Sequence, residues 1–247
     1  MPGTIRVGVG GWNFEPWRGV FYPDDLPQKR ELEYASRALT SIEINGTYYS
    51  SFKPDSWQKW HDETPDGFVF SVKASRFCTN RKVLADAGSS IEKFFAQGID
   101  RLGAKLGPIN WQLANTKKFD AEDCDAFLAL LPKKVGALTL RHAIEVRHPS
   151  FVDPAFYKLA KKHAVAIVLA SGSEYPEIDE QTAGFTYARL MVTDDKRAKG
   201  VTPQTLKKIA ERAKTWAKRG DAFVYFISAA KVRNPSAAEA LIGALRK

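Results

Sequence analysis

Strand-like and helix-like segments alternate along the whole chain, and this alternation constrains the fold more than any other feature. Eight short runs have the length and apolar character of buried strands: Ile5–Gly10, Ser41–Asn45, Phe68–Ala74, Lys105–Leu113, His142–Arg147, Val165–Ala170, Phe185–Met191 and Ala222–Ser228. Seven further stretches have helical periodicity: Lys29–Leu39, Asp55–Asp62, Ser90–Leu102, Ala121–Leu131, Pro154–His163, Pro203–Arg219 and Pro235–Arg246. Strands joined by helical crossovers are typical of α/β proteins with a parallel sheet.

The strand count predicts an α/β fold in the form of a single parallel, eight-stranded (β/α)8 TIM-type barrel, with residues 1–247 as one domain. No linker-like segment or internal repeat divides the chain. The alternative is an open, doubly wound sheet with a glycine-rich first turn. The segment 8–12 fits that fingerprint poorly, because the third glycine is absent and the bulky Trp12 follows.

Three of the helices are predicted to begin with a polar capping residue followed by proline, a favoured first helical residue. These pairs are Asp153-Pro154, Thr202-Pro203 and Asn234-Pro235. Only the connection Ser171–Thr182 lacks a helical pattern.

Composition limits the cellular setting. No run of 18 apolar residues is present, so we expect no membrane span, and the first residues lack the apolar stretch of a signal peptide. Two cysteines, Cys78 and Cys124, in 247 residues are typical of a reduced, cytoplasmic protein. The net charge of +9 is compatible with an anionic small molecule or a nucleic acid as partner. Nothing in the sequence indicates the oligomeric state.

Polar and charged residues recur at the carboxyl ends of the expected strands, although parallel strands are usually apolar throughout. Side chains two residues apart point to the same face of a strand. This phase pairs Glu43 with Asn45, Ser71 with Lys73, Asn110 with Gln112, Glu145 with Arg147, and Tyr187 with Arg189. Because burying one unpaired ion costs several kcal/mol, we expect these groups to converge at the C-terminal mouth of the barrel, where active sites of this fold lie.

The charges in this ring predict its chemistry. Lys73, Arg147 and Arg189 outnumber Glu43 and Glu145, which leaves a cation for an anionic ligand. Two carboxylates beside cations can serve as acid and base, and a buried lysine can act as a base or form a Schiff base. An internal salt-bridge network, with Glu43 bound to Arg147 and Glu145 to Lys73, is the purely structural alternative.

A phosphate site is also expected after the last strand, where this fold often binds phosphate. Ser228, Lys231 and Arg233 precede the helix that begins near Pro235. Solvated side chains on a loop are an equally good interpretation of Lys231 and Arg233. No metal site and no cofactor are predicted, since among the four histidines only His148 lies near the mouth.

The chain resembles the YecE-like family of barrels, catalogued as domain of unknown function seventy-two. The resemblance runs from Gly8 to about Leu245, and its motifs follow one another in the same order along the chain. They are Gly10-Gly11-Trp12, Trp17-Arg18-Gly19-Val20-Phe21-Tyr22-Pro23, Ile42-Glu43-Ile44-Asn45-Gly46-Thr47-Tyr48-Tyr49, Phe70-Ser71-Val72-Lys73-Ala74-Ser75-Arg76, Leu106-Gly107-Pro108, Trp111-Gln112-Leu113 and Glu145-Val146-Arg147-His148. The resemblance implies a TIM-type barrel but no known reaction.

The chain departs from the family pattern at four strand ends. Histidine is common in the family where this chain has Asn80, and aspartate is common at Ser171. Strand seven commonly ends in His-Gly and strand eight in an Asp-Asn-Asp-like stretch, whereas this chain has Met191-Val192 and Ser228-Ala229-Ala230. The resemblance leaves open whether these losses alter an activity.

Together these observations predict a metal-independent enzyme that acts by acid/base chemistry on a small anionic substrate, phosphorylated or carboxylated. The sequence does not choose among a hydrolase, a lyase and an isomerase. The expected catalytic residues are Glu43, Lys73 and Glu145. The expected substrate-binding residues are Asn45, Tyr48, Arg76, Gln112, Arg147, His148, Arg189, Ser228, Lys231 and Arg233.

Two other functions stay open. One is a nucleic-acid-binding or phosphodiester-processing barrel, in which aromatic residues near the mouth stack on bases. The candidate residues are Trp12, Trp17, Tyr48 and Tyr49, although aromatics also pack as a lid or under a loop. The other is a ligand-binding barrel without catalysis.

Overall fold

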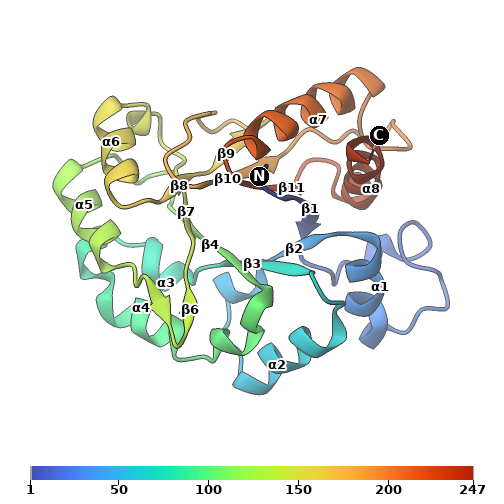
Figure 1. Ribbon diagram of the computed structural model, residues 1–247, viewed down its shortest axis with the longest axis horizontal. Coiled ribbons are helices and arrows are strands. Elements are labelled where there is room, and N and C mark those ends of the chain that lie inside the picture. The colour runs from blue at the N-terminus through green and yellow to red at the C-terminus, as the bar shows by residue number, and fades with distance from the viewer. Residues whose placement is uncertain (1, 247) are drawn as a thin grey trace.

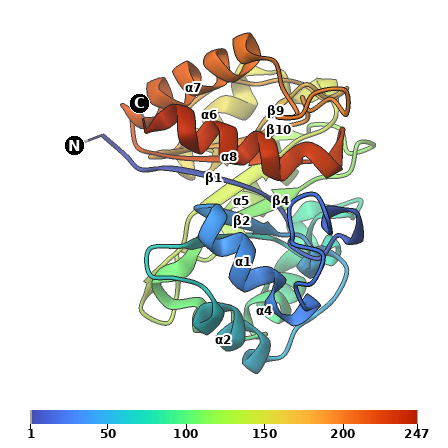
Figure 2. The same ribbon diagram turned by 90° about the vertical axis from the view of Figure 1, so that its right-hand side faces the viewer.

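The computed structural model describes residues 2–246. Its strands form one parallel sheet that curls into a nearly closed barrel, with helices on the outside (Figures 1 and 2). The strand order is β8-β7-β4-β3-β2-β1-β11-β10-β9. The bounds are β1 Ile5–Gly10, β2 Ser41–Ile44, β3 Val69–Lys73, β4 Leu106–Gln112, β7 His142–Glu145, β8 Ala166–Ile167, β9 Leu169–Ser171, β10 Phe185–Leu190 and β11 Asp221–Phe226. The predicted parallel α/β barrel is confirmed.

The two edge strands of the sheet, β8 and β9, are consecutive in the chain and correspond to the single strand predicted at Val165–Ala170. β8 pairs with β7 through Ala143–Ala166 and Ile144–Ile167. β9 pairs with β10 through Ala188–Leu169, Arg189–Ala170 and Leu190–Ser171. β8 and β9 are therefore one strand with a break at Val168. This strand joins the two edges of the sheet and completes a barrel of the eight predicted strands.

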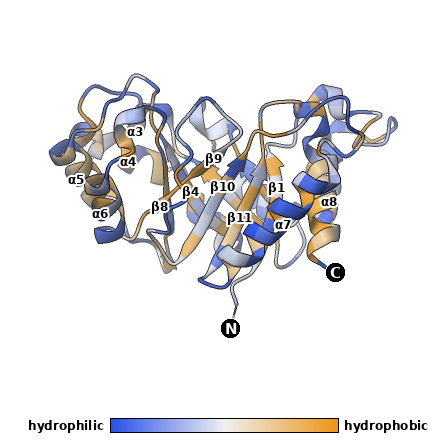
Figure 3. Ribbon diagram, turned by 90° about the horizontal axis from the view of Figure 1, so that it is seen from above, coloured by the Kyte–Doolittle hydropathy of each residue, from blue (hydrophilic) through white to orange (hydrophobic). Residues whose placement is uncertain are grey.

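Amphipathic helices cover the outside of the barrel, with their apolar faces toward the sheet. Their bounds are α1 Glu31–Ala38, α2 Pro54–Glu63, α3 Arg76–Thr79, α4 Gly88–Phe95, α5 Ala121–Leu130, α6 Pro154–Lys162, α7 Pro203–Ala217 and α8 Asn234–Leu245. Figure 3 shows strands that are mainly orange and outer helices such as α7 with long blue segments. No helix within residues 2–246 combines the length and apolarity needed to cross a bilayer.

Several helix boundaries differ from the expectation. Asp153 and Thr202 cap α6 and α7 as predicted. The predicted cap at Asn234 is wrong, because Asn234 is the first residue of α8 and its side chain donates instead to the Ser228 carbonyl. The stretch expected as one helix at 90–102 is α4 followed by the short 3₁₀ helix Ile99–Lys105, because Gly98 at φ +90° interrupts it.

Besides several short 3₁₀ helices, two elements were not expected from the sequence. A small antiparallel hairpin, β5 Lys134–Val135 and β6 Leu138–Thr139, precedes β7. The short helix α3 follows β3 directly and begins with Ser75, whose side chain accepts from the Phe77 amide. This helix places Arg76 beside the carboxyl end of β3.

Buried apolar side chains form two clusters, one on each side of the sheet. The larger lies between strands and helices and contains Trp17, Trp57 and Trp111. The smaller fills the barrel interior and contains Val69, Ala143, Ala166, Val168, Phe185, Tyr187, Phe223, Tyr225 and Ile227. The interior is thus packed at its lower levels, and the fully buried carboxylates of Glu43 and Glu145 lie at the level above.

Candidate functional site

Strand alternation brings the predicted polar residues together at the carboxyl ends of the strands. Glu43 in β2, Asn110 in β4 and Glu145 in β7 are fully buried. Gln112, Lys73 and Arg189 are exposed by no more than 7%. We call this set, with Tyr187 and Arg147, the polar cluster. The polar cluster contains all the charged residues of the ring that the sequence predicts.

Arg189 lies at the centre of the polar cluster and joins the two carboxylates. Its Nη2 atom donates to Glu43 Oε1 at 3.1 Å, and its Nη1 atom donates to Glu145 Oε2. Burial would lower the pKa of Arg189, but the two carboxylates outweigh this effect and raise it. Both carboxylates therefore share one permanent cation.

Glu145 is held by more donors than any other residue of the cluster. Its Oε1 atom accepts from Gln112 Nε2 at 2.8 Å and from Arg147 Nε at 2.9 Å. Asn110 Nδ2 lies 3.3 Å from its Oε2 atom. Burial alone would raise the pKa of Glu145, but Arg189 and Arg147 overcome this effect and lower the pKa to about 2. Glu145 is therefore ionised throughout the physiological pH range.

Glu43 is linked to a chain of hydroxyl groups that descends into the barrel. Tyr187 OH donates to Glu43 Oε2 at 2.6 Å and lies 2.6 Å from Ser71 Oγ. Ser71 Oγ also donates to the carbonyl of Pro108. Burial and the neighbouring Glu43 carboxylate raise the pKa of Tyr187 well above its ordinary value. Tyr187 is therefore a neutral donor that holds Glu43 in place.

Lys73, at the end of β3, has a different environment from the other cations. Its Nζ atom lies 4.1 Å from the centroid of the Tyr48 ring. Among residues 2–246, no carboxylate lies within ion-pair distance (4.0 Å) of this amine. Burial lowers the pKa of Lys73 to about 8, and the Arg189 cation adds to this effect. The purely structural alternative paired Lys73 with Glu145 and Glu43 with Arg147. These two pairings are wrong, because both carboxylates bind Arg189.

The rim of the cluster carries two more cations. The Arg147 guanidinium lies 4.4 Å from the Tyr175 ring centroid, and its Nη1 atom is 3.4 Å from Tyr175 OH. Arg76 is exposed and its guanidinium lies 5.4 Å from the Phe77 ring. Burial raises the pKa of Tyr48, while the cations of Arg147 and Arg76 oppose the rise, so all three side chains share this part of the mouth.

His148 and the loop after β11 lie outside the hydrogen-bond network of the cluster. His148 Nδ1 accepts from the Ser150 amide and contacts Ser150 Oγ, which makes it a cap of a short 3₁₀ helix. The Lys231 Nζ atom lies 3.9 Å from the Phe14 ring centroid. Ser228 is exposed, and Arg233, which precedes α8, makes no hydrogen bond to the polar cluster within residues 2–246. The expected phosphate-binding residues thus form a separate group beside the cluster.

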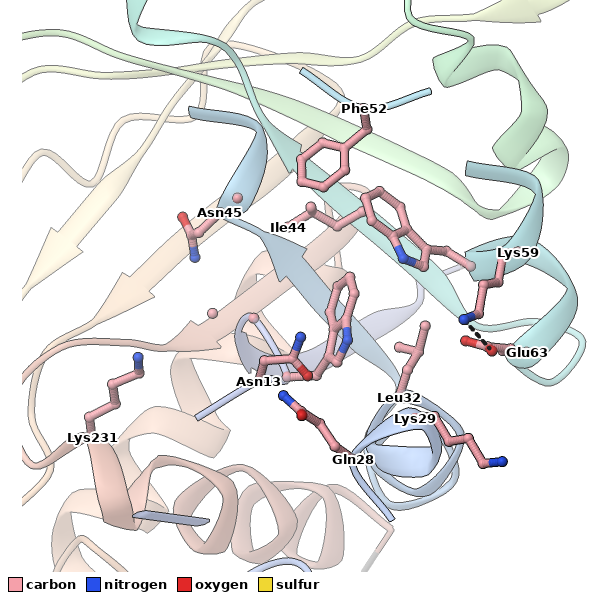
Figure 4. Close-up of a pocket in the computed structure, with 15 residues that line it drawn as sticks. Asn13, Gln28, Lys29, Leu32, Ile44, Asn45, Phe52, Lys59, Glu63 and Lys231 are labelled. Atoms are coloured by element: carbon pink, nitrogen blue, oxygen red, sulfur yellow. Dashed lines mark ion pairs between the residues drawn. The ribbon is translucent and has the colours of Figure 1, made fainter. Parts of the chain in front are cut away.

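A cavity of about 580 Å³ lies beside the polar cluster, at the carboxyl ends of β1 and β2 (Figure 4). Of the predicted substrate-binding residues only Asn45 and Lys231 line it, together with Trp12 from the residues predicted to stack on bases. No sequence pattern selects the other lining groups, which include Asn13, Gln28, Phe52 and Trp60. These residues come from loops, from the short 3₁₀ helix Gln28–Arg30 and from helix α2, where strand alternation carries no information. The same holds for Tyr175, whose loop has no periodic pattern.

The metal-binding potential of the mouth can be read from its side chains. Within the described part of the chain, no group of three or more His, Cys, Asp or Glu residues is placed to hold a metal ion.

The four positions that depart from the family pattern lie near the carboxyl ends of strands. Asn80 follows α3, Ser171 ends β9, Met191 follows β10 and Ser228 follows β11.

Fold and mouth together define a (β/α)8-type barrel with a charged centre at its C-terminal end. The family model described as protein of unknown function DUF72 matches residues 6–247. The chain belongs to the DUF72 family, as its resemblance to YecE-like proteins indicates.

Known relatives agree with this assignment. The UPF0759 protein YecE of Escherichia coli (strain K12) is 24% identical over 147 residues, which are 60% of this chain and 50% of YecE. The chain thus spans about half the length of this curated relative. A DUF72 family protein of Thermotoga maritima MSB8 superposes with a TM-score of 0.83 at 22% identity, over 99% of this chain and 100% of that chain.

A more distant structure supports the barrel. A xylose isomerase-like TIM barrel/4-hydroxyphenylpyruvate dioxygenase fusion protein has a TM-score of 0.53 at 13% identity, over 95% of this chain and 41% of that one. Likeness at these identities concerns the fold and not the reaction.

Proposed function

We propose that this protein is an enzyme that acts without a metal ion on a small anionic substrate at the C-terminal mouth of its barrel. Lys73 is the group that transfers a proton, and the substrate is phosphorylated or carboxylated. The observation that carries the proposal is the Lys73 amine, which is 7% exposed, has no ion pair among residues 2–246, and sits at a strand end. A buried lysine of this kind has a pKa suited to general-base work.

The balance of charge in the polar cluster supports an anionic substrate. Glu43 and Glu145 are both engaged by Arg189, and Arg147 also binds Glu145. Lys73 is left as a cation without a carboxylate, and Arg76 lies on the rim above it. Arginine side chains recognise carboxylates and phosphates with two parallel hydrogen bonds. Arg147 already uses Nε and Nη2 on Glu145, so it offers its Nη1 atom, and a substrate held there and by Arg76 would have its neighbouring carbon or oxygen atoms near Lys73.

Two polar atoms of the cluster support binding of a ligand there. Asn110 Oδ1 and Arg189 Nε are buried and have no hydrogen-bond partner among residues 2–246. Buried polar groups normally have a partner, and an exception is often found where a protein binds a ligand or an ordered water molecule. One atom is an acceptor and the other a donor, so an ordered water molecule or a polar ligand group that reaches the cluster would satisfy both.

The roles within the proposed mechanism differ from residue to residue. Glu145, with a pKa near 2, stays ionised, so it positions Arg189 and Arg147. Glu43 does the same for Arg189 and lends negative charge that favours the protonated form of Lys73. The neutral amine of Lys73 removes a proton from the substrate and returns it later, as in isomerase and lyase reactions.

Thermal-shift screening of phosphorylated and carboxylated metabolites, followed by turnover assays on the compounds that bind, tests this proposal. In the Lys73→Met variant we expect binding to persist and turnover to fall by at least about 100-fold, the usual contribution of a general base. In Arg147→Ala we expect binding to weaken, whereas the exposed Lys208→Ala on α7 serves as the matched control. Unchanged turnover in Lys73→Met would overturn the assignment of Lys73, and binding without turnover for every ligand would identify a non-catalytic binding protein.

Exposed aromatic residues favour one second candidate, binding of single-stranded nucleic acid. Tyr49 and Phe77 are each 65% exposed, and Phe77 lies against the Arg76 guanidinium. Exposed aromatics beside cations stack on bases, whereas Trp17 is fully buried and takes no part. The test is binding of a fluorescent oligothymidine at several salt concentrations, with Tyr49→Ala and Phe77→Ala as variants. Steep salt dependence and loss in both variants would support this candidate, and no binding would end it.

A further inference from the structure

We infer that the cavity beside the polar cluster binds a flat aromatic ring that carries a hydrogen-bond donor at its inner end and an anionic group at its outer end. The inference deepens the proposed function, on which it rests in one respect, namely that the ligand enters at the C-terminal mouth of the barrel. A volume of about 580 Å³ is within the range of small-molecule sites in proteins.

One side of the cavity is aromatic and aliphatic. The Trp12 and Trp60 rings meet edge to face at a centroid distance of 5.3 Å, and Phe52 meets Trp60 at 5.0 Å. Leu32 and Ile44, both buried, complete this side. Aromatic walls of this kind favour stacked or edge-on contact with another ring. The bulk of the ligand is therefore a planar, apolar ring system.

The inner end of the cavity is lined by Gly10, Asn45 and Gly46. A β carbon added to Gly10 would lie 2.6 Å from Asn45 Nδ2 and 3.2 Å from Ile227 Cγ2, so protein atoms already fill the space beside this glycine. Glu43 is fully buried, whereas the Asn45 side chain lines the cavity. The Asn45 Nδ2 atom lies 3.5 Å from the Glu43 carbonyl, and its Oδ1 atom accepts no hydrogen bond from residues 2–246. The ligand group that faces Asn45 therefore carries a donor such as a hydroxyl or an amine.

The outer end of the cavity is polar and has a net positive charge. Lys29, Lys59 and Glu63 line one side of this rim and Lys231 the opposite side (Figure 4), and Lys59 pairs with Glu63 at 3.6 Å. Lys29 and Lys231 have no carboxylate partner in residues 2–246. Asn13 and Gln28 stand nearby in Figure 4 and supply amide groups. An anionic group on the ligand is the chemistry that matches this rim.

The loop that carries Lys231 has strained backbone. Ser228 and Ala229 have φ angles of +51° and +46°, a region that residues other than glycine rarely occupy. Asn234 holds them by donating to the Ser228 carbonyl at 3.3 Å, and Thr193 in turn donates to Asn234 at 2.7 Å. Strain of this kind gathers at functional sites, where the surrounding structure enforces it. Here it fixes the course of the loop that presents Lys231 to the cavity.

Isothermal titration calorimetry with three naphthalene compounds tests the inference on the full chain. The probes are 6-hydroxy-2-naphthoate, 2-naphthoate, which lacks the donor, and 2,6-dihydroxynaphthalene, which lacks the anion. We expect 6-hydroxy-2-naphthoate to bind about tenfold more tightly than either of the others, since one good hydrogen bond or charge contact contributes about one decade. Crystals soaked with this compound should place its ring against Trp12 and its hydroxyl near Asn45.

Variants separate the contacts. Lys231→Ala should weaken naphthoate binding, with Lys208→Ala on α7 as the control, and Trp12→Ala should weaken all three probes. Asn45→Ala should remove the preference for the hydroxylated compound, because it deletes the amide at the inner end, with the exposed Asn80→Ala after α3 as the control. Equal affinities in Trp12→Ala and wild type, or density for the ring elsewhere, would overturn the inference.

Binding to Lys73→Met distinguishes the inference from the proposed function. Unchanged probe affinity in this variant, together with the losses above, supports the aromatic site whether or not turnover is ever found. Turnover that depends on Lys73 but involves no ligand in the cavity would leave the proposed function standing and overturn the inference.

Discussion

The amine of Lys73 lies 4.1 Å from the centre of the Tyr48 ring. The negative face of an aromatic ring attracts a cation, but burial opposes the charge more strongly, and the pKa of Lys73 is lowered to about 8. Near pH 8 the Lys73 amine is therefore charged in part of the molecules, which favours an anionic ligand, and neutral in the others, where it can accept a proton.

The cost of burying this amine predicts the stability of Lys73→Met. The lysine pKa is about 8 in the folded protein and 10.5 ordinarily, so the unfolded chain binds more protons between these values and wild-type stability rises with pH across this window. We expect Lys73→Met to be more stable than wild type at pH 7, by up to about 3 kcal/mol. Urea unfolding at pH 7 and pH 10 measures this difference, which should shrink at the higher pH. A difference independent of pH would contradict the lowered pKa.

The same shift predicts the pH profile of catalysis once a substrate is known. If the neutral amine is the base, kcat/KM should rise with pH and level off above an apparent pKa of about 8. Steady-state rates between pH 6 and pH 10 provide the measurement. A profile that is flat through this range would remove Lys73 from proton transfer.

Glu145 is expected to matter for folding as well as for the site. Glu145→Gln leaves Arg189 and Arg147 without their shared charge, so we expect a loss of roughly 3–5 kcal/mol. Glu33→Gln on α1, whose ion pairs with Arg30 and Arg37 are on the surface and screened by solvent, should cost far less stability than Glu145→Gln. Chemical denaturation at pH 7 compares the two variants. Equal losses would mean that the buried network contributes little.

The contribution of the Glu145 carboxylate to stability should be lost in acid. The pKa of Glu145 is about 2 in the folded protein and 4.5 ordinarily, so its stabilising effect is complete above pH 4.5 and disappears as the pH falls toward 2. The stability gap between wild type and Glu145→Gln should therefore narrow over this range. Unfolding measured at pH 5, 4 and 3 shows whether it does.

Close approach of two strands predicts the effect of a small change at Gly8. A β carbon there would lie 1.8 Å from the carbonyl oxygen of Ser41, a backbone atom of the neighbouring strand β2. We expect Gly8→Ala to destabilise the barrel by several kcal/mol, about the upper range for overpacking. Gly243→Ala in α8 meets no atom within 4 Å and should instead stabilise the protein by up to about 1 kcal/mol. Thermal unfolding of both variants tests this contrast.

The barrel was predictable because its signals are local and periodic. The predicted bounds of β1 and the capped starts of α6 and α7 match the structure, since strand alternation and capping depend on neighbouring residues only. The convergence of Glu43, Glu145 and Arg189 was predictable for the same reason, because their phase on the strands fixes the side on which they lie.

The exact pairing was not predictable. Lys73 and Arg189 have the same charge and the same phase, yet only Arg189 lies between the carboxylates. The choice depends on where each strand stands around the barrel and on its stagger, which single-sequence patterns do not contain. The residues of the cavity were missed because Asn13, Gln28 and Phe52 lie outside regular strands. Asn234 was misread as a helix cap because its side chain bonds to a strained loop.

The titration of the Lys73 amine tests the central claim most directly. Carbon-13 NMR of the lysine ε carbons, with the Lys73 signal identified by its absence in Lys73→Met, gives its pKa in the intact protein. We predict a value near 8, two to three units below an exposed lysine. A value near 10.5 would show an ordinary charged amine and would contradict the proposal that this residue is the reactive group of the mouth.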